Sequence, residues 1–338
     1  MKHFIKTLAL ASMASLCSCT KVFYTNAQVL NQYKITRDLN SRPEFVSEKT
    51  TNGLSEAYNA DNSAFANVLN PLPNGFAHND YCHKRPLYDA LENGFTNIEA
   101  DIFLKNDKLI VAHIFPYFKG SRTLESLYLQ PLFERITNNK GKVFAGYNSP
   151  VILMIDIKTN ADKTYKVLKI QLEKYKSILS GFENGKVVNR AITIVLSGHK
   201  PCTLLKNEPN RLAFIDEDLF KMAPDSVNNN LFTMASCKYS HLVKWNGDGV
   251  FPAAEKNKLC ALVASAHKMG ARVRLWASPE KKEVWDELLK CGVDLINTDQ
   301  LATLKNYLTT KQIQKATDEQ NLYRDLNRYF KEAFLSQK

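Results

Sequence analysis

Residues 76–113 read FAHNDYCHKRPLYDALENGFTNIEADIFLKNDKLIVAH, and their pattern sets the architecture expected for the whole chain. An apolar pair runs into His78, a short amphipathic segment ends at Gly94, and a second apolar run extends from Asn97 to Leu104. Glycine commonly ends a helix, and a short, largely apolar run is typical of a buried strand. The stretch therefore predicts a strand–helix–strand unit.

The polar residues of this unit are placed for metal chemistry. Glu99 and Asp101 lie two residues apart on the second predicted strand, so their carboxylates project from the same face. A turn at Asn106-Asp107 leads into a return strand that carries His113, and His78 ends the first strand. Two imidazoles and two carboxylates on neighbouring strands suit an oxygen-ligated divalent cation flanked by acid/base histidines.

Strand-like and helical runs alternate through the rest of the chain. The runs that resemble strands include VILMIDIK (151–158), AITIVLS (191–197), RVRLWA (272–277) and DLINT (294–298). The count of core strands approaches eight, which predicts an α/β fold, a TIM-type (β/α)8 barrel. No glycine-rich turn follows the first strand, which argues against a Rossmann domain.

Barrels of this type carry their chemistry at the C-terminal ends of the strands. Polar and aromatic residues fall near the ends of the predicted strands: His78, Glu99, Asp101, Asp156, Lys158, Ser197, Asp216, Trp276 and Asp299. We therefore expect these side chains to gather at one end of the barrel.

The sequence predicts four segments. Residues 1–18 are typical of a signal peptide, because two lysines precede a short apolar run that is too short to span a membrane. Residues 19–70 are polar and predict a tether, and residues 71–310 form the predicted barrel. Residues 311–338 predict an added C-terminal helix with apolar side chains at helical spacing. Packing on the barrel is the favoured interpretation of this helix, and a partner-binding or membrane-surface helix is the alternative.

The N-terminus also suggests a destination. Leu16-Cys17-Ser18-Cys19 resembles a bacterial lipobox, in which Cys19 becomes the lipidated first residue of the mature protein. This predicts an exported protein held at a membrane of the bacterial cell envelope by its lipid anchor. Ordinary cleavage, giving a periplasmic or secreted protein, is the alternative.

The charge of the chain indicates which partners to expect. The 338 residues carry a formal net charge of +11, which suits an anionic partner such as phosphate, a phospholipid headgroup or an acidic surface. No basic run is interleaved with aromatic residues, so nucleic acid is not an expected partner.

The cysteines beyond residue 19 are odd in number and form no CxxC pair, which indicates neither a complete disulfide framework nor a zinc site. Several of them lie in apolar contexts and are expected to be buried as small apolar residues.

Seven motifs follow one another between about residue 74 and residue 308. They are HNDY (78–81), PLYDALENGFTNIEADIFL (86–104), RTLESLYLQPL (122–132), LMIDIKT (153–159), ITIVLSGHKP (192–201), VRLWASP (273–279) and GVDLINTDQL (292–301). With these motifs the chain resembles the superfamily of phosphatidylinositol-specific phospholipases C and glycerophosphodiester phosphodiesterases. Within it, the chain looks similar to the branch of fungal altered-inheritance-of-mitochondria proteins and bacterial lipoproteins.

The resemblance implies roles for individual residues. His78 and His113 match the two catalytic histidines, Glu99 and Asp101 match the family's metal-binding pair, and Asp156 stands where a third acidic ligand is expected. Asn79 matches an asparagine that ligates calcium in eukaryotic phosphoinositide phospholipases C, whereas glycerophosphodiesterases have arginine there. Two further matches are Lys158, near the substrate phosphate, and Trp276, an aromatic residue that lines the pocket in some relatives.

Some of these residues have plainer interpretations. Asn79 could cap a turn, Lys158 could pair with Asp156, and Trp276 could belong to the core. Asp80, Ser197 and Asp299 are the remaining pocket candidates, and Asp80 and Asp299 could instead be simple hydrogen-bonded structural groups.

The expected function is a metal-dependent phosphodiester hydrolase or lyase that acts on a phospholipid headgroup or a related phosphodiester. Oxygen ligands select Mg²⁺ or Ca²⁺, and histidines provide general acid/base catalysis. Two alternatives use the same surface: a non-catalytic lipoprotein that binds phosphorylated ligands, and a phosphomonoesterase with the same metal site.

Overall fold

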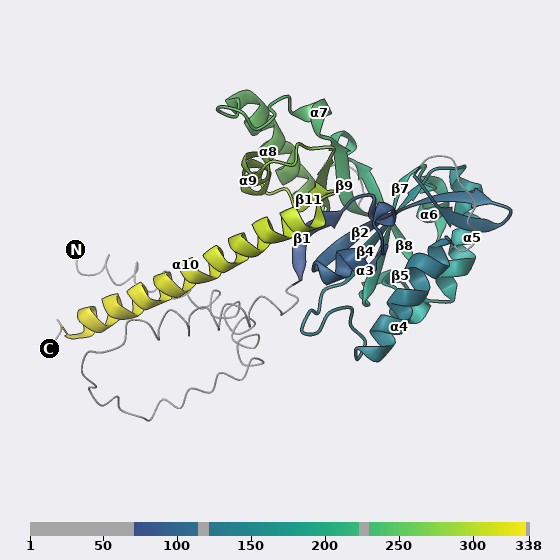
Figure 1. Ribbon diagram of the computed structural model, residues 1–338, viewed down its shortest axis with the longest axis horizontal. Helices are drawn as coiled ribbons and strands as arrows, with labels where there is room; N and C mark the ends of the chain where they lie inside the picture. Colours follow the sequence, from purple (N-terminus) through teal and green to yellow (C-terminus); the bar gives the residue numbers. More distant parts are fainter. Residues whose placement is uncertain (1–70, 114–121, 223–229, 336–338) are drawn as a thin grey trace. The chain divides into compact units, whose positions relative to one another are not determined.

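The computed structural model describes residues 71–113, 122–222 and 230–335. Parallel strands form a closed ring in chain order (Figure 1). They are β1 (Leu72–Ala77), β2 (Phe95–Lys105), β4 (Val151–Ile157), β7 (Ile192–Gly198), β8 (Ala213–Asp218), β9 (Phe232–Lys238), β10 (Arg272–Trp276) and β11 (Leu295–Thr298). Because β1 pairs in parallel with both β2 and β11, the sheet closes on itself, which confirms the predicted TIM-type barrel.

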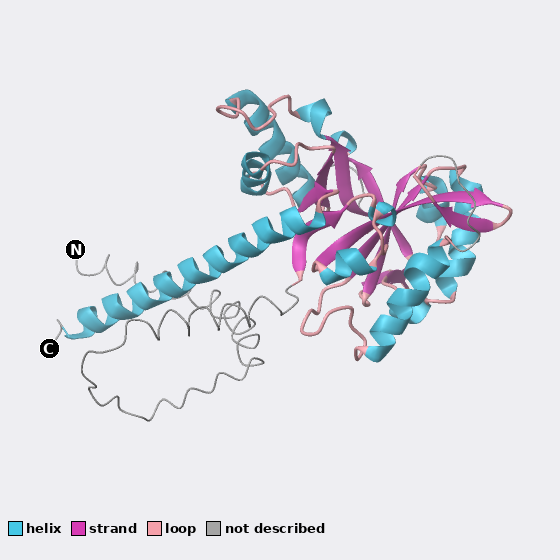
Figure 2. Ribbon diagram, in the orientation of Figure 1, coloured by secondary structure: helices cyan, strands magenta, loops and turns pink. Residues whose placement is uncertain are grey.

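Helices connect the strands around the outside of this ring (Figure 2). They are α3 (Tyr88–Glu92), α4 (Gln130–Asn138), α5 (Ala161–Glu173), α6 (Cys202–Asn207), α7 (Tyr239–Leu242), α8 (Ala253–Lys268), α9 (Lys282–Lys290) and α10 (Leu301–Leu335). Short helical turns are η1 (Asp80–Cys82), η2 (Glu125–Leu129), η3 (Lys176–Ile178) and η4 (Leu219–Lys221). The predicted return strand is β3 (Lys108–Val111), which pairs antiparallel with β2. A small hairpin of β5 (Gly181–Glu183) and β6 (Lys186–Val188) was not predicted.

The two faces of the ring bury different sets of residues. On β2, Ile98, Ala100 and Ile102 belong to the large core between the ring and its helices. A separate cluster of buried apolar residues comes from several strands and fills the inside of the ring: Phe76, Ile152, Met154, Val195, Met234 and Leu295. Because both faces are covered, a strand such as β4 is apolar along most of its length, as expected for parallel sheets.

Helix α10 is longer than the sequence suggested. A barrel helix ending near Leu308 and a separate helix from residue 311 were predicted, but α10 is continuous. Its first part is anchored, since the Tyr307 hydroxyl donates to Asp286 Oδ1 at 2.9 Å and Gln312 Nε2 donates to the Pro71 carbonyl at 3.3 Å. Leu322, by contrast, is 61% exposed. The prediction that this later part packs on the barrel is therefore wrong for the side chains that the structure describes.

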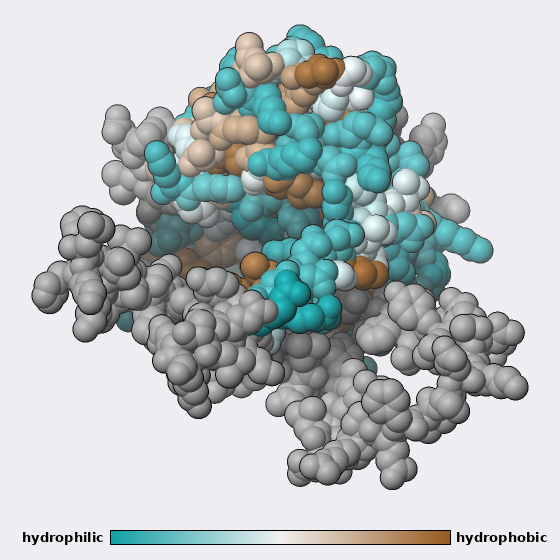
Figure 3. Space-filling model, turned by 90° about the vertical axis from the view of Figure 1, so that its left-hand side faces the viewer, coloured by the Kyte–Doolittle hydropathy of each residue, from teal (hydrophilic) through white to brown (hydrophobic). Residues whose placement is uncertain are grey.

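Exposed apolar side chains on α10 are Ile313, Leu322, Tyr323 and Leu326. Hydrophilic residues cover most of the described surface on the face shown in Figure 3. Within the described ranges, no helix has both the length and the apolar character that a membrane crossing requires. The predicted signal peptide and tether, including Cys19, lie outside the described residues.

One disulfide corrects the expectation for the cysteines. Cys260 on α8 is bonded to Cys291 at the end of α9, whereas Cys82, Cys202 and Cys237 are free. The two bonded cysteines are 31 residues apart in sequence, and only the packing of α8 beside α9 brings them together. No local pattern could have predicted this pair.

Candidate active site

A cavity of about 470 Å³ opens at the C-terminal ends of the barrel strands. Most of the predicted site residues line it: His78, Asn79, Glu99, Asp101, His113, Asp156, Lys158, Ser197 and Trp276. The structure therefore brings together side chains that are spread over roughly two hundred residues of sequence, at the end of the barrel where the topology predicts chemistry.

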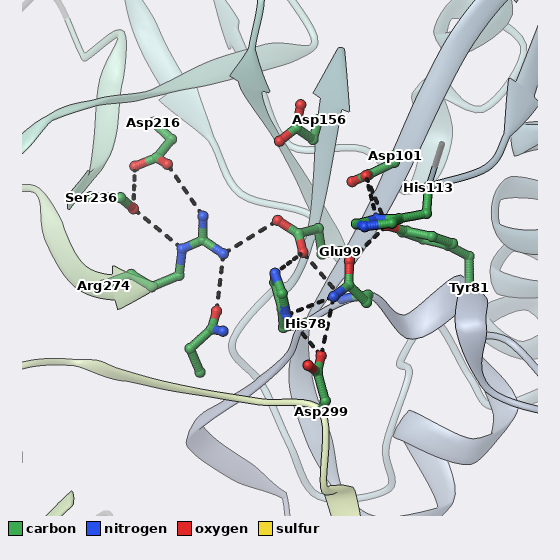
Figure 4. A network of polar contacts seen from close by, with 12 residues as sticks. His78, Tyr81, Glu99, Asp101, His113, Asp156, Asp216, Ser236, Arg274 and Asp299 are labelled. Carbon is green, nitrogen blue, oxygen red and sulfur yellow. Dashed lines mark hydrogen bonds and ion pairs between the residues drawn. The ribbon is translucent and has the colours of Figure 1, made fainter. Parts of the chain in front are cut away.

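Three carboxylates form the centre of the site. Glu99 and Asp101 alternate along β2 and are 4% and 2% exposed, and Asp101 stands in register with Asp156 on β4. One carboxylate oxygen from each residue lies within 4.8 Å of the others, and Figure 4 shows the three groups side by side. Burial, followed by the charge of Glu99, raises the pKa of Asp101 to about 6, although Lys158 opposes this shift. Such crowding of like charges is characteristic of a cation site.

Lys158 compensates only part of this charge. Its Nζ lies 3.0 Å from Asp101 Oδ2 and 3.0 Å from Asp156 Oδ2, so the predicted pairing with Asp156 is present. Burial lowers the pKa of Lys158, but the two carboxylates outweigh it and raise the pKa above its usual value. Asp156 Oδ1 is buried without a hydrogen-bond partner. That oxygen is free to bind a metal ion, and a buried acceptor without a partner is otherwise costly.

The charge of the whole cavity also favours a divalent cation. Six carboxylates line it but only four lysine and arginine side chains, so two negative charges are in excess when histidines are neutral. Hard oxygen ligands of this kind suit Mg²⁺ or Ca²⁺.

Gly198 allows Asp156 to take its position. The φ angle of Gly198 is +67°, and a Cβ atom there would lie 2.1 Å from Asp156 Oδ1. Any other residue at this position would therefore strain the backbone and collide with the carboxylate. The close approach of the β7 end to β4 depends on this glycine.

His78 is held from both sides. Its Nδ1 lies 2.7 Å from Asp299 Oδ1, and its Nε2 lies 3.5 Å from Glu99 Oε2. Burial alone would lower the pKa of His78, but the hydrogen bond with Asp299 and the charges of Glu99 and Asp299 raise it. Asp299 thus orients the ring so that Nε2 faces the carboxylates, as expected for an acid/base histidine with a fixed tautomer.

His113 reaches the cluster through Tyr81. Its Nδ1 lies 2.9 Å from the Tyr81 hydroxyl and 3.7 Å from Asp101 Oδ2. The two rings are stacked with their centroids 6.2 Å apart, and the Tyr81 hydroxyl is also 2.8 Å from Asp101 Oδ2. Tyr81 therefore positions His113 beside the carboxylates. The role of this tyrosine could not be predicted from the sequence, because its contact with His113 depends on the β2–β3 hairpin.

Asn79 occupies the left-handed backbone region, with φ of 49°, and its backbone N–H donates to Glu99 Oε2 at 3.2 Å. Its side-chain Oδ1 accepts a hydrogen bond from the Tyr81 hydroxyl at 2.7 Å. The backbone thus orients Glu99, whereas a metal-ligand role for the amide stays a prediction.

A second charged network lies beside the carboxylates; the sequence analysis singled out its Asp216 but not Arg274 or Ser236. Arg274, 3% exposed, places Nη1 3.3 Å from Glu99 Oε1 and Nη2 3.8 Å from Asp216 Oδ2. Ser236 donates to Asp216 Oδ1 at 2.7 Å, and the Arg274 guanidinium lies over the Phe76 ring at 4.3 Å. Figure 4 shows Arg274 between Asp216 and Glu99. Strand alternation could have revealed it, since an arginine inside a barrel requires anionic partners.

The prediction that Asp80 lines the pocket is wrong. Asp80 is fully buried, and its Oδ2 accepts hydrogen bonds from the Leu87 N–H at 2.6 Å and the Tyr128 hydroxyl at 2.8 Å. The left-handed turn at Asn79 directs the next side chain away from the cavity. Burial raises the pKa of Asp80 to about 6.

The other pocket candidates take distinct places. Ser197 lines the cavity in register with Asp156. Asp299 contacts His78, as described above, and is not among the residues that line the cavity. Trp276 is 37% exposed at the end of β10, so it is a cavity residue and does not belong to the core.

Comparison with known proteins shows which families this chain is similar to. The AIM6-like phosphodiesterase domain matches residues 64–216, and the glycerophosphoryl diester phosphodiesterase family matches residues 272–302. Over these two segments the chain matches the glycerophosphodiester phosphodiesterase superfamily. The two matched segments contain the three carboxylates, both histidines and Arg274. The chain thus carries a phosphodiesterase domain, whose class implies a small phosphodiester substrate.

The similar curated proteins described here come from fungi, and one similar solved structure is bacterial. The chain is 28% identical over 290 residues to altered inheritance of mitochondria protein 6 of Eremothecium gossypii, covering 75% of each chain. It is 28% identical over 282 residues to the protein of the same name from Saccharomyces cerevisiae, covering 69% of this chain and 70% of that protein. A solved glycerophosphodiester phosphodiesterase from Parabacteroides distasonis aligns with a TM-score of 0.45 and 15% identity, covering 72% of this chain and 99% of the other.

These relatives correct one prediction. The curated relatives are fungal, which contradicts the bacterial cell-envelope localisation predicted from the N-terminus. That localisation is wrong. Two lysines, an apolar run and a cysteine are common residue types, and a pattern built from them has little power to identify a compartment.

Proposed function

We propose that this protein is a metal-dependent phosphodiesterase that uses histidines as general acid and base. The observation that carries the proposal is the cluster of Glu99, Asp101 and Asp156, which lies within 4.8 Å and is flanked by His78 and His113. An orphaned carboxylate oxygen and an excess of negative charge support a divalent cation, Mg²⁺ or Ca²⁺, at this position.

A phosphodiester resists attack because its anionic oxygens repel nucleophiles. A bound divalent cation supplies positive charge against those oxygens and lowers the pKa of an attacking hydroxyl or water. Lys158, which already lies between Asp101 and Asp156, adds a fixed positive charge beside the phosphate. The bound cation and this lysine would therefore together reduce the repulsion between the phosphate oxygens and the nucleophile.

The histidines move the protons. One removes a proton from the attacking hydroxyl or water, and the other gives a proton to the leaving oxygen. Asp299 fixes the ring of His78 through Nδ1, so its Nε2 faces Glu99 at the carboxylate cluster. Tyr81 fixes the ring of His113 through Nδ1, so its Nε2 is left for the substrate. Each histidine contributes on the order of 10²–10⁴-fold to the rate.

The test is turnover of bis(p-nitrophenyl) phosphate with Mg²⁺ or Ca²⁺. We expect activity that is lost with EDTA, restored by the cation, and lost in Glu99→Gln. Release from p-nitrophenyl phosphate at a higher rate would indicate a phosphomonoesterase instead. Activity that persists in EDTA and in Glu99→Gln would contradict the proposal, and binding of phosphodiesters without turnover would favour a non-catalytic protein.

A further inference from the structure

The wall of the cavity opposite Glu99 and Asp101 carries a different pair of side chains, a lysine and a tryptophan. In the ring of strands, β9 is the fourth strand from β2 in either direction, so it lies across the barrel from Glu99 and Asp101. Lys238 ends β9, Trp276 ends β10, and the two residues pair in register. Both line the cavity, which therefore extends from the carboxylate cluster to this lysine and tryptophan.

Lys238 differs from the other cations of the cavity. Lys158 pairs with Asp156, Lys200 lies 3.4 Å from Glu217, and Arg274 lies 3.3 Å from Glu99. Lys238 forms no ion pair with a carboxylate anywhere in residues 71–113, 122–222 and 230–335. Its ammonium instead lies over the Trp276 ring, 5.6 Å from the centroid.

The carboxylates on this side of the cavity are occupied elsewhere. Glu217 Oε1 accepts hydrogen bonds from Lys200 Nζ and from the Asp218 N–H, the latter at 2.8 Å. Asp218 Oδ1 accepts from the Phe220 N–H at 3.0 Å. The charge of Lys238 is therefore available to a ligand, and the aromatic face holds the ammonium in place without neutralising it.

We propose that Lys238 and Trp276 form a second anion-binding position, and that the substrate is a phosphodiester whose alcohol portion carries a further anionic group, a carboxylate or a phosphomonoester. This inference rests on the proposed function, because the phosphodiester itself is placed at the carboxylates across the ring. Lys238 binds the further anion, and the exposed Trp276 face contacts the apolar part of the same alcohol.

A matched pair of substrates tests whether Lys238 binds a further anionic group of the substrate. One is p-nitrophenyl 2-carboxyethyl phosphate, and the other is p-nitrophenyl propyl phosphate, which lacks the carboxylate. We expect the wild type to prefer the carboxyethyl diester through a lower KM. Lys238→Met should reduce this preference about tenfold, as expected for one partly exposed charge-assisted hydrogen bond. Lys238→Arg should retain it, and Lys166→Met, which removes an exposed lysine of α5 outside the cavity, should not alter it.

Binding separates this inference from the proposed function. If neither diester is turned over, the proposed function fails, and calorimetric binding of the same two diesters still tests Lys238. A preference for the carboxyethyl diester that Lys238→Met abolishes supports the second position. Equal treatment of the two diesters by the wild type, or an unchanged preference in Lys238→Met, overturns it.

Assays with lipid vesicles show whether the further anionic group belongs to a lipid headgroup or to a free small molecule. Phosphatidylcholine vesicles carrying phosphatidylserine or phosphatidylethanolamine offer headgroups that differ by one carboxylate. Loss of a phosphatidylserine preference in Lys238→Met assigns the position to a lipid headgroup. A Lys238-dependent preference seen only with the soluble diesters assigns it to a free small molecule.

Discussion

The two sides of the barrel mouth treat buried charge differently. On β2 and β4, three carboxylates crowd within 4.8 Å, and Lys158 is the cation that lies between two of them. On β8 and β10, Asp216 and Arg274 balance each other, with Ser236 completing the bonds of the aspartate. The first side is left with excess negative charge, which the proposed cation would neutralise, whereas Asp216 and Arg274 satisfy each other within the protein. Excess negative charge therefore marks the side that we propose to be reactive.

Glu99 joins the two sides, because it accepts from Arg274 through Oε1 and faces His78 through Oε2. A change on the reactive side should remove activity with little loss of stability. A change on the balanced side should lower stability first.

His78→Ala tests the reactive side. We expect turnover of bis(p-nitrophenyl) phosphate to fall by about 10²–10⁴-fold, because the ring is lost as acid or base. The matched control is His267→Ala. His267 lies on α8 away from the cavity and pairs with Asp294, so its removal should leave turnover unchanged. Equal losses in the two variants would contradict a special role for His78.

Arg274→Met tests the balanced side. Removing the guanidinium leaves Glu99 and Asp216 buried without their cation, so we expect the free energy of unfolding to fall by about 3–5 kcal/mol. Urea denaturation measures this loss. Arg328→Met, which removes a solvent-exposed arginine of α10, should not shift the unfolding midpoint. An Arg274 variant as stable as wild type would show that this network is not a structural support.

Gly198→Ala separates backbone strain from collision with the reactive carboxylate. Gly249 is the control, because it has a similar φ of +66° but no atoms within 4 Å of an added Cβ. Gly249→Ala should cost roughly 1–2 kcal/mol of stability through its backbone conformation alone. Gly198→Ala should cost more and should also weaken cation binding, because Asp156 must move. Identical effects of both variants on unfolding and on cation binding would contradict this account.

Asp80→Asn concerns the loop that carries Asn79 and Tyr81. Burial raises the pKa of Asp80 to about 6 in the folded state, so folding takes up a proton as the pH falls from about 6 towards 4. The wild type should therefore gain roughly 1–3 kcal/mol over the variant across this window on acidification. Urea unfolding at the two pH values measures the difference, and a constant difference would mean that Asp80 titrates normally.

The sequence was sufficient where periodicity governs position. Alternation placed Glu99 and Asp101 on one strand face, and the βα repeat placed Asp156 at the same end of the barrel. Both predictions need only the strand period and the rule that parallel strands point the same way. The closed ring follows from the same repeat.

Contacts that depend on tertiary packing could not be predicted. The Tyr81–His113 pair requires the β2–β3 hairpin, and the Cys260–Cys291 bond requires α8 to pack beside α9. Asp80 was misplaced because a left-handed residue before it reverses the direction of its side chain. Such reversals are set by a single φ angle, which residue type suggests only weakly.

The central claim is that Glu99, Asp101 and Asp156 hold one divalent cation, and calorimetric titration of the full chain with Mg²⁺ and Ca²⁺ addresses it. We predict one ion per chain for the wild type and binding at least about tenfold weaker in Asp156→Asn. Asp218→Asn, a cavity carboxylate on the balanced side, should bind the ion as the wild type does. Absence of binding to the wild type, or equal weakening in both variants, would contradict the account.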